Sequence, residues 1–302
     1  MGSRMAAENG QHYVIRLAVV AASLGFIGAC GHGASGTSNH APTESAQVAG
    51  TSSLGNDVVD YFFPATGPQL TIGSSVYGAM MAVKTGITSR CLRRYGFHQA
   101  AWSAATAASL SFDNADFPDL AKMTHTGLFD SATLSAAQGP PRGLSAAKQR
   151  AYMADMGRCE ISAEDVFAPL TEATNALSNT WTKIISQTES SSPVLATLAG
   201  YRSCMEAAGV PPTSLSGLST SQALGGFLAW ETGAETQAAG RAGEIAVERH
   251  WVPIFVRCAT PTVKVQDSLL LARQREFLRA HSQQVLTVEA LANREIALAI
   301  RR

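Results

Sequence analysis

The segment Cys91-Leu92-Arg93-Arg94-Tyr95-Gly96-Phe97 recurs later in the chain, in altered form, as Cys204-Met205-Glu206-Ala207-Ala208-Gly209-Val210. In both segments a glycine follows the cysteine by five residues, and an apolar residue follows the glycine. Glycine commonly ends an α-helix, because it adopts the left-handed backbone conformation without steric cost. We therefore expect two helices that end in the same way, each with a cysteine beside its end.

A second pair of similar segments follows. The dipeptide Arg158-Cys159 matches Arg257-Cys258, and the same apolar residues recur at three later positions: Val166 with Val265, Leu170 with Leu269, and Ala173 with Ala272. These matches predict two further helices, each of which starts just after its cysteine. Chance similarity between apolar heptads is the alternative. The shared cysteine–glycine and arginine–cysteine steps favour a real, degenerate repeat.

The four cysteines of these segments predict two disulfides, because an even number of cysteines in an exported chain is typical of disulfide bonding. They form no C-x-x-C and are far apart in the sequence, so we predict no metal site. If the first helix of each repeat ends against the start of the second, the simplest pairing is Cys91–Cys159 with Cys204–Cys258. Crossed pairings between the repeats remain open.

Apolar residues recur at three- and four-residue steps through most of the chain after residue 68, which predicts amphipathic helices. Few segments alternate like strands. We therefore predict an all-α fold of long helical hairpins, stapled by the two disulfides. Two degenerate repeats, 69–190 and 191–302, would pack as one globular unit.

Some helix boundaries are also indicated. Ser162, followed by acidic residues, is expected to cap a long helix. Pro253 is expected to kink a helix or to cap a new one. The pair Thr260-Pro261 has the residue types of an N-cap and first helical position, so it is expected to start the last helix.

The N-terminal part has the features of a secretory signal. Residues 17–29 are uncharged and largely apolar, Arg4 and Arg16 precede them, and Cys30 follows. About 20 apolar residues are needed to span a bilayer permanently, so this segment is too short. We expect residues 1–29 to be a signal peptide. Residues 30–68, rich in Gly, Ser, Thr and Ala, are predicted to form a flexible tether.

The sequence Ile27-Gly28-Ala29-Cys30 resembles the lipobox of bacterial lipoproteins. The resemblance implies cleavage before Cys30, a thioether-linked diacylglycerol on its sulfur, and acylation of the new amine. More than one acyl chain gives stable anchoring. The expected partner is therefore the membrane, through the lipid on Cys30, and the expected location is the outer face of the cytoplasmic membrane, facing the cell wall. An ordinary secretory signal that contains a cysteine is the alternative.

The Cys204–Val210 segment and the later Val256-Arg257-Cys258 also resemble motifs of uncharacterised secreted lipoproteins of actinobacteria. In that family a Cys-Met helix end, with a glycine and an aromatic residue, precedes an "Asp-Val-x-Cys" helix start. This chain departs from the pattern, because Val210 replaces the aromatic residue and Phe255-Val256 stands where Asp-Val is common. The resemblance spans about residues 70–302 and implies fold, disulfides and location, but no activity.

Composition and motifs favour a binding or structural role. The chain has a net charge of +0 and no basic run, which excludes the electrostatic footprint of a nucleic-acid-binding protein. It contains no G-x-S-x-G, H-E-x-x-H or phosphate-binding glycine loop. We therefore expect no catalytic residue and no cofactor. The leading hypothesis is a non-catalytic, membrane-anchored module with an envelope protein or cell-wall polymer as partner. An accessory subunit of an envelope transporter remains open.

Two further sets of residues could carry function. Glu231 with Glu235, and Glu244 with Glu248, lie one helical turn apart and are candidates for the acid–base chemistry of a cell-wall hydrolase. The same spacing is common on solvated helix faces. A binding groove is the second candidate, although aromatic residues at helical spacing usually belong to the core. Its candidate lining is Tyr95, Trp102, Trp230 and Trp251.

Overall fold

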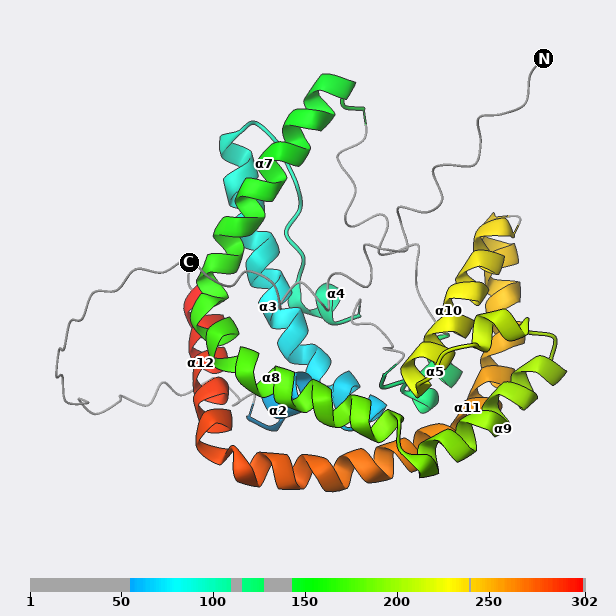
Figure 1. The fold of residues 1–302 in the computed structure, drawn as a ribbon. Coiled ribbons are helices and arrows are strands. Elements are labelled where there is room, and N and C mark those ends of the chain that lie inside the picture. The colour runs from blue at the N-terminus through cyan, green and yellow to red at the C-terminus, as the bar shows by residue number, and fades with distance from the viewer. Residues whose placement is uncertain (1–54, 110–115, 128–142, 239, 301–302) are drawn as a thin grey trace, which may run out of the picture. The chain divides into compact units, whose positions relative to one another are not determined.

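Every regular element is helical in the part of the chain that the computed structural model describes, which comprises residues 55–109, 116–127, 143–238 and 240–300 (Figure 1). This confirms the predicted all-α fold. The first four helices are α2 (Gly55–Phe62), α3 (Gly67–Arg94), α4 (Ala104–Ser109) and α5 (Leu120–Thr126). The later elements are α7 (Ala146–Glu164), the 3₁₀ turn η1 (Asp165–Phe167), α8 (Ala168–Glu189), α9 (Ser192–Ala207), the 3₁₀ turn η2 (Pro212–Leu215), α10 (Thr220–Gln237), α11 (Gly240–Ala280) and α12 (Ser282–Ile300).

The two recurring segments end their helices with the same hydrogen bonds, as the sequence predicts. At the end of α3, the Phe97 N–H donates to the Leu92 carbonyl oxygen at 3.0 Å, and Gly96 has a φ of 80°. At the end of α9, the Val210 N–H donates to the Met205 carbonyl oxygen at 3.1 Å. Both ends are Schellman motifs, in which a glycine with positive φ lets the chain turn back on the helix. The recurrence is therefore structural at these two helix ends.

The second pair of cysteines lies inside helices, so the prediction that helices start after them is wrong. Cys159 lies within α7 and Cys258 within α11. Ser162 is also inside α7, where its hydroxyl donates to the Arg158 carbonyl oxygen at 3.3 Å instead of capping a helix. The cap of α7 is Ser145, whose side chain accepts from the Lys148 N–H. The break between α7 and α8 comes later, at η1.

Helix α11 continues through both of its prolines, and neither starts a new helix. Pro253 and Pro261 lie within it, although proline removes a hydrogen bond from the helix interior. Side chains at helical spacing are buried along one face of this stretch, which offsets the loss by packing. The fully or nearly fully buried members of this face are Val252, Phe255, Cys258, Ala259 and Val263.

Residues 55–68 belong to the helical unit, so the predicted tether extends too far. They form α2, a short turn and the start of α3. The Trp181 indole N–H donates to the Pro64 carbonyl oxygen at 3.0 Å, and the Gln274 amide donates to the Phe63 carbonyl oxygen at 2.6 Å. Phe63 itself is completely buried. The rest of the tether and the signal peptide lie outside the described residues.

Two main apolar clusters organise the unit. One contains residues of α2, α3, α8, the second half of α11 and α12, and within it Trp181 packs on Phe277. The other contains residues of α5, α9, α10 and the first half of α11, with Phe227 and Phe255 stacked at 4.9 Å. A smaller cluster joins the end of α3 to α7. Residues 54–302 group into one compact unit.

The predicted repeat boundary at residues 190 and 191 does not separate these clusters. Leu270, Phe277 and Val288, from the second repeat, pack with the helices of the first. Met123, from the first repeat, packs with the helices of the second. Residues that match in sequence also differ in burial, since Leu170 is buried and Leu269 is only partly buried. The repeat is therefore retained at the cysteine-bearing helices and lost in the surrounding core.

Candidate functional site

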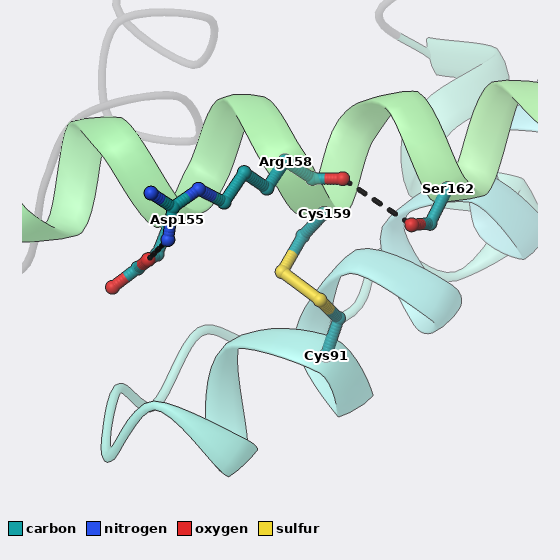
Figure 2. Close-up of a disulfide and its surroundings, with 5 residues drawn as sticks. All are labelled: Cys91, Asp155, Arg158, Cys159 and Ser162. Atoms are coloured by element: carbon teal, nitrogen blue, oxygen red, sulfur yellow. Dashed lines mark hydrogen bonds and ion pairs between the residues drawn. A yellow bond between two sulfur atoms is a disulfide. The ribbon is translucent and has the colours of Figure 1, made fainter.

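The two predicted cysteine pairs are disulfide-bonded: Cys91 with Cys159 (Figure 2), and Cys204 with Cys258. The Cα–Cα distance is 5.6 Å in both. Each joins the last turns of a helix that ends in a Schellman motif to the interior of a second helix. The crossed pairings between the repeats are therefore not formed. Cys30, the predicted lipidation site, lies outside the described residues.

The four candidate groove residues do not come together. Trp230 and Trp251 contact each other, with ring centroids 4.9 Å apart, and pack against the α10–α11 cluster. Tyr95 is exposed at the end of α3, and the Trp102 backbone N–H donates to the Thr85 hydroxyl. The prediction of one groove lined by all four is wrong. Trp230 and Trp251 extend an aromatic row through Phe227, so they serve the core.

Three of the four candidate glutamates converge between α10 and α11. Glu231 is completely buried, Glu235 is nearly so, and Glu248 is partly buried. Apart from the neighbouring Glu235 carboxyl group, the Glu231 oxygens have no hydrogen-bond partner among the described residues. Burial, followed by the charges of Glu235 and Glu248, raises the pKa of Glu231 to about 8. A buried carboxyl group with carboxylate neighbours takes up a proton to avoid an unpaired buried charge.

The grouping of these glutamates differs from the predicted pairs. Glu248 approaches Glu231 from the facing helix, whereas Glu244 is not among the charges that act on Glu231. The end of α5 closes over this position, because a β-carbon on Gly127 would collide with the Glu248 carboxylate. Gly127 has a φ of 90°, which glycine adopts readily. We name Glu231, Glu235 and Glu248 the carboxyl cluster.

Other acidic side chains lie where helices pack together, and their surroundings could not be recognised from the sequence. Glu189, nearly fully buried at the end of α8, accepts a hydrogen bond from the Ser221 hydroxyl at 2.8 Å, in the first turn of α10. An anion is favourable at the N-terminus of a helix. Asp119 caps α5 and accepts from the Thr71 hydroxyl at 2.8 Å. Burial and the Asp119 charge raise the pKa of Asp267 to about 7. Only the N-cap role of Asp119 has a local sequence signal.

The described residues contain no group of three or more His, Cys, Asp or Glu side chains with the geometry of a metal site. Among the described helices, none combines the length and apolar character that crossing a bilayer requires. Comparisons of the chain with protein-family models, curated proteins and solved structures gave no match.

Proposed function

We propose that the chain is an exported lipoprotein whose helical unit is a non-catalytic binding or structural module of the bacterial cell envelope. A lipid on Cys30 would hold it to the outer face of the cytoplasmic membrane, facing the cell wall. Its partner would be an envelope protein or a cell-wall polymer.

The observation that carries the proposal is the pairing of all four cysteines that follow Cys30. Disulfides form and persist in oxidising compartments and are rare in the reducing cytosol. Cys159 and Cys258 are both buried, which shields each bond from reductants. A chain with two such bonds suits the space outside the cytoplasmic membrane. The lipobox-like sequence that ends at Cys30 supplies the anchor.

Lipidation is tested by expressing the chain in a bacterium that processes lipoproteins, with a labelled fatty acid in the medium. The wild-type chain should carry the label and remain with the membranes. Cys30→Ala should carry no label and should keep residues 1–29, which a larger mass than that of the wild-type chain would reveal, while the control Ser35→Ala should behave as wild type. A wild-type chain without label would argue against the anchor, and four free thiols in exported protein would argue against the location.

A cell-wall hydrolase is a second candidate, because the carboxyl cluster provides a group with the raised pKa of a general acid. The complete burial of Glu231 weighs against it, since a general acid must reach the bond that it cleaves. Release of dye from labelled peptidoglycan should be absent for the wild-type chain. Activity lost in Glu231→Gln but retained in the exposed control Glu276→Gln would favour the hydrolase instead.

A further inference from the structure

The end of α3 lies beside the second half of α7, and the two helices run antiparallel, so the first turns of α7 extend past the end of α3. Lys84 Nζ lies 5.8 Å from the ring centroid of Phe167, and the ring centroids of Phe97 and Tyr152 are 5.3 Å apart. The disulfide lies between these two contacts. Five exposed cations lie on the last turns of α3 and the first turns of α7, and we name this end of the helix pair the basic tip: Arg90, Arg93, Arg94, Lys148 and Arg150.

Cations outnumber acidic residues at the basic tip in the part of the chain that the structure describes. Residues 90–104 and 143–154 contain no aspartate or glutamate. Within the described ranges, no ion pair joins any of the five cations to an acidic residue. The next acids along α7 are Asp155, which is paired with Arg158 at 3.1 Å (Figure 2), and Glu160, whose charge acts on Tyr152. Since the whole chain has a net charge of +0, this local excess is a specific feature of the tip.

Two large apolar side chains are exposed among these cations. Tyr95, in the C-cap position of α3, is 49% exposed, and Met153, on α7, is 50% exposed. A tyrosine ring with a hydroxyl at its end suits the boundary between lipid and water. Cations combined with exposed apolar side chains are typical of surfaces that bind anionic membranes, because headgroup phosphates and the acyl boundary are contacted together.

We propose that the basic tip is a membrane contact that docks onto the anionic phosphate headgroups of a bilayer. Its cations would meet the phosphates, and the Tyr95 ring and Met153 side chain would enter the headgroup region. The disulfide and the Schellman end of α3 hold the tip in one conformation, so docking orders little of the chain. This contact does not depend on the lipid at Cys30 and adds to the proposed function.

The test uses the mature chain, residues 30–302, with Cys30→Ser, which lacks the apolar signal segment and cannot take the lipid, so that failure of the anchor and failure of the tip are separated. Sedimentation with phosphatidylglycerol–phosphatidylcholine vesicles should show binding that weakens with salt. Vesicles of phosphatidylcholine alone should bind far less. Each cation near an anionic bilayer strengthens binding about fivefold. R93Q/R94Q should therefore weaken binding about 25-fold.

The matched control R273Q/R275Q removes the same charge from exposed positions of α11 and should change binding less than about twofold. Tyr95→Ser leaves the charge intact and should weaken binding more than about threefold. Far-ultraviolet circular dichroism and a non-reducing gel confirm that each variant is folded and disulfide-bonded. The proposal for the basic tip would be overturned if neutral and anionic vesicles bound the chain equally. It would also be overturned if R273Q/R275Q lost as much binding as R93Q/R94Q. If Tyr95→Ser bound anionic vesicles as well as wild type did, and soluble polyphosphate bound as well as the vesicles, the bilayer would not be the partner.

Discussion

Trp181 donates its indole N–H to the carbonyl oxygen of Pro64, which lies 117 residues earlier in the chain, at 3.0 Å. The indole is almost completely buried and also packs on Phe277, with ring centroids 5.3 Å apart. One side chain of α8 thus fixes the turn between α2 and α3 and contacts α11.

Trp181→Phe should destabilise the unit by about 1–3 kcal/mol, because the buried Pro64 carbonyl oxygen loses its donor and the smaller ring leaves a void. Urea unfolding followed by circular dichroism measures this free energy. Leu286→Ala, at an exposed position of α12, is the control and should change it by less than about 0.5 kcal/mol. A Trp181→Phe chain as stable as wild type would contradict the role of this hydrogen bond.

Each disulfide should contribute about 4 kcal/mol of stability, because it closes a long loop in the unfolded chain. The sequence separations are 68 residues for Cys91–Cys159 and 54 for Cys204–Cys258. The double variants C91A/C159A and C204A/C258A should therefore lose similar free energies of unfolding, measured with denaturant. A non-reducing peptide map should contain these two pairs, and a peptide linking Cys91 to Cys204 would refute the pairing.

The carboxyl cluster should make stability fall as pH rises. The pKa of Glu231 is raised from 4.5 to about 8 in the folded state by burial and by the neighbouring Glu235 and Glu248. Between these values the folded chain holds a proton that the unfolded chain has released. The contribution of Glu231 is thus fully present below pH 4.5 and is lost as pH rises through about 8.

The slope of that loss should be about 1.4 kcal/mol per pH unit. Asp267, with its pKa raised to about 7, also lowers stability as pH rises, over a lower pH range than Glu231. Glu231→Gln, which is neutral at every pH, should remove most of the slope above pH 7 and stabilise the chain at pH 8. The exposed control Glu276→Gln should retain the wild-type slope in urea titrations across pH. A flat profile for the wild-type chain would show that Glu231 is solvated.

Two glycines inside helices should respond oppositely to alanine. A β-carbon on Gly73 would lie 2.6 Å from the backbone nitrogen of Tyr61, where α2 packs on α3, so Gly73→Ala should cost about 1–3 kcal/mol. Gly157, in α7, has no heavy atom within 4 Å of the added carbon. Gly157→Ala should stabilise the chain by up to about 1 kcal/mol, because alanine favours the helix. Thermal unfolding midpoints that move the same way in both variants would contradict this close packing.

The features that the sequence predicted correctly have local causes. The two Schellman ends follow from a glycine placed five residues after each cysteine, and this signal lies within one short segment. The disulfide pairing followed because the same local pattern occurs twice. The all-α class followed from apolar periodicity, which also spans only a few turns at a time.

The features that were missed depend on distant residues. The stretch before Gln69 reads as a tether because its small residues resemble a linker, yet Phe63 is buried by Trp181 and Phe277, more than a hundred residues away. Pro261 reads as a helix start because local chemistry favours it, but packing on one face carries α11 through it. The burial of Glu231 depends on how α10 and α11 fold back on each other, which no spacing of glutamates encodes.

Helix α11 contributes side chains to both main apolar clusters, Phe255 to one and Phe277 to the other, without interruption between them. Because this helix is continuous, unfolding of either cluster would also unwind part of a helix that the other cluster stabilises. Heating should therefore produce one calorimetric transition for the two clusters. A mechanical force applied at the α10–α11 connection would be transmitted along α11 to α12.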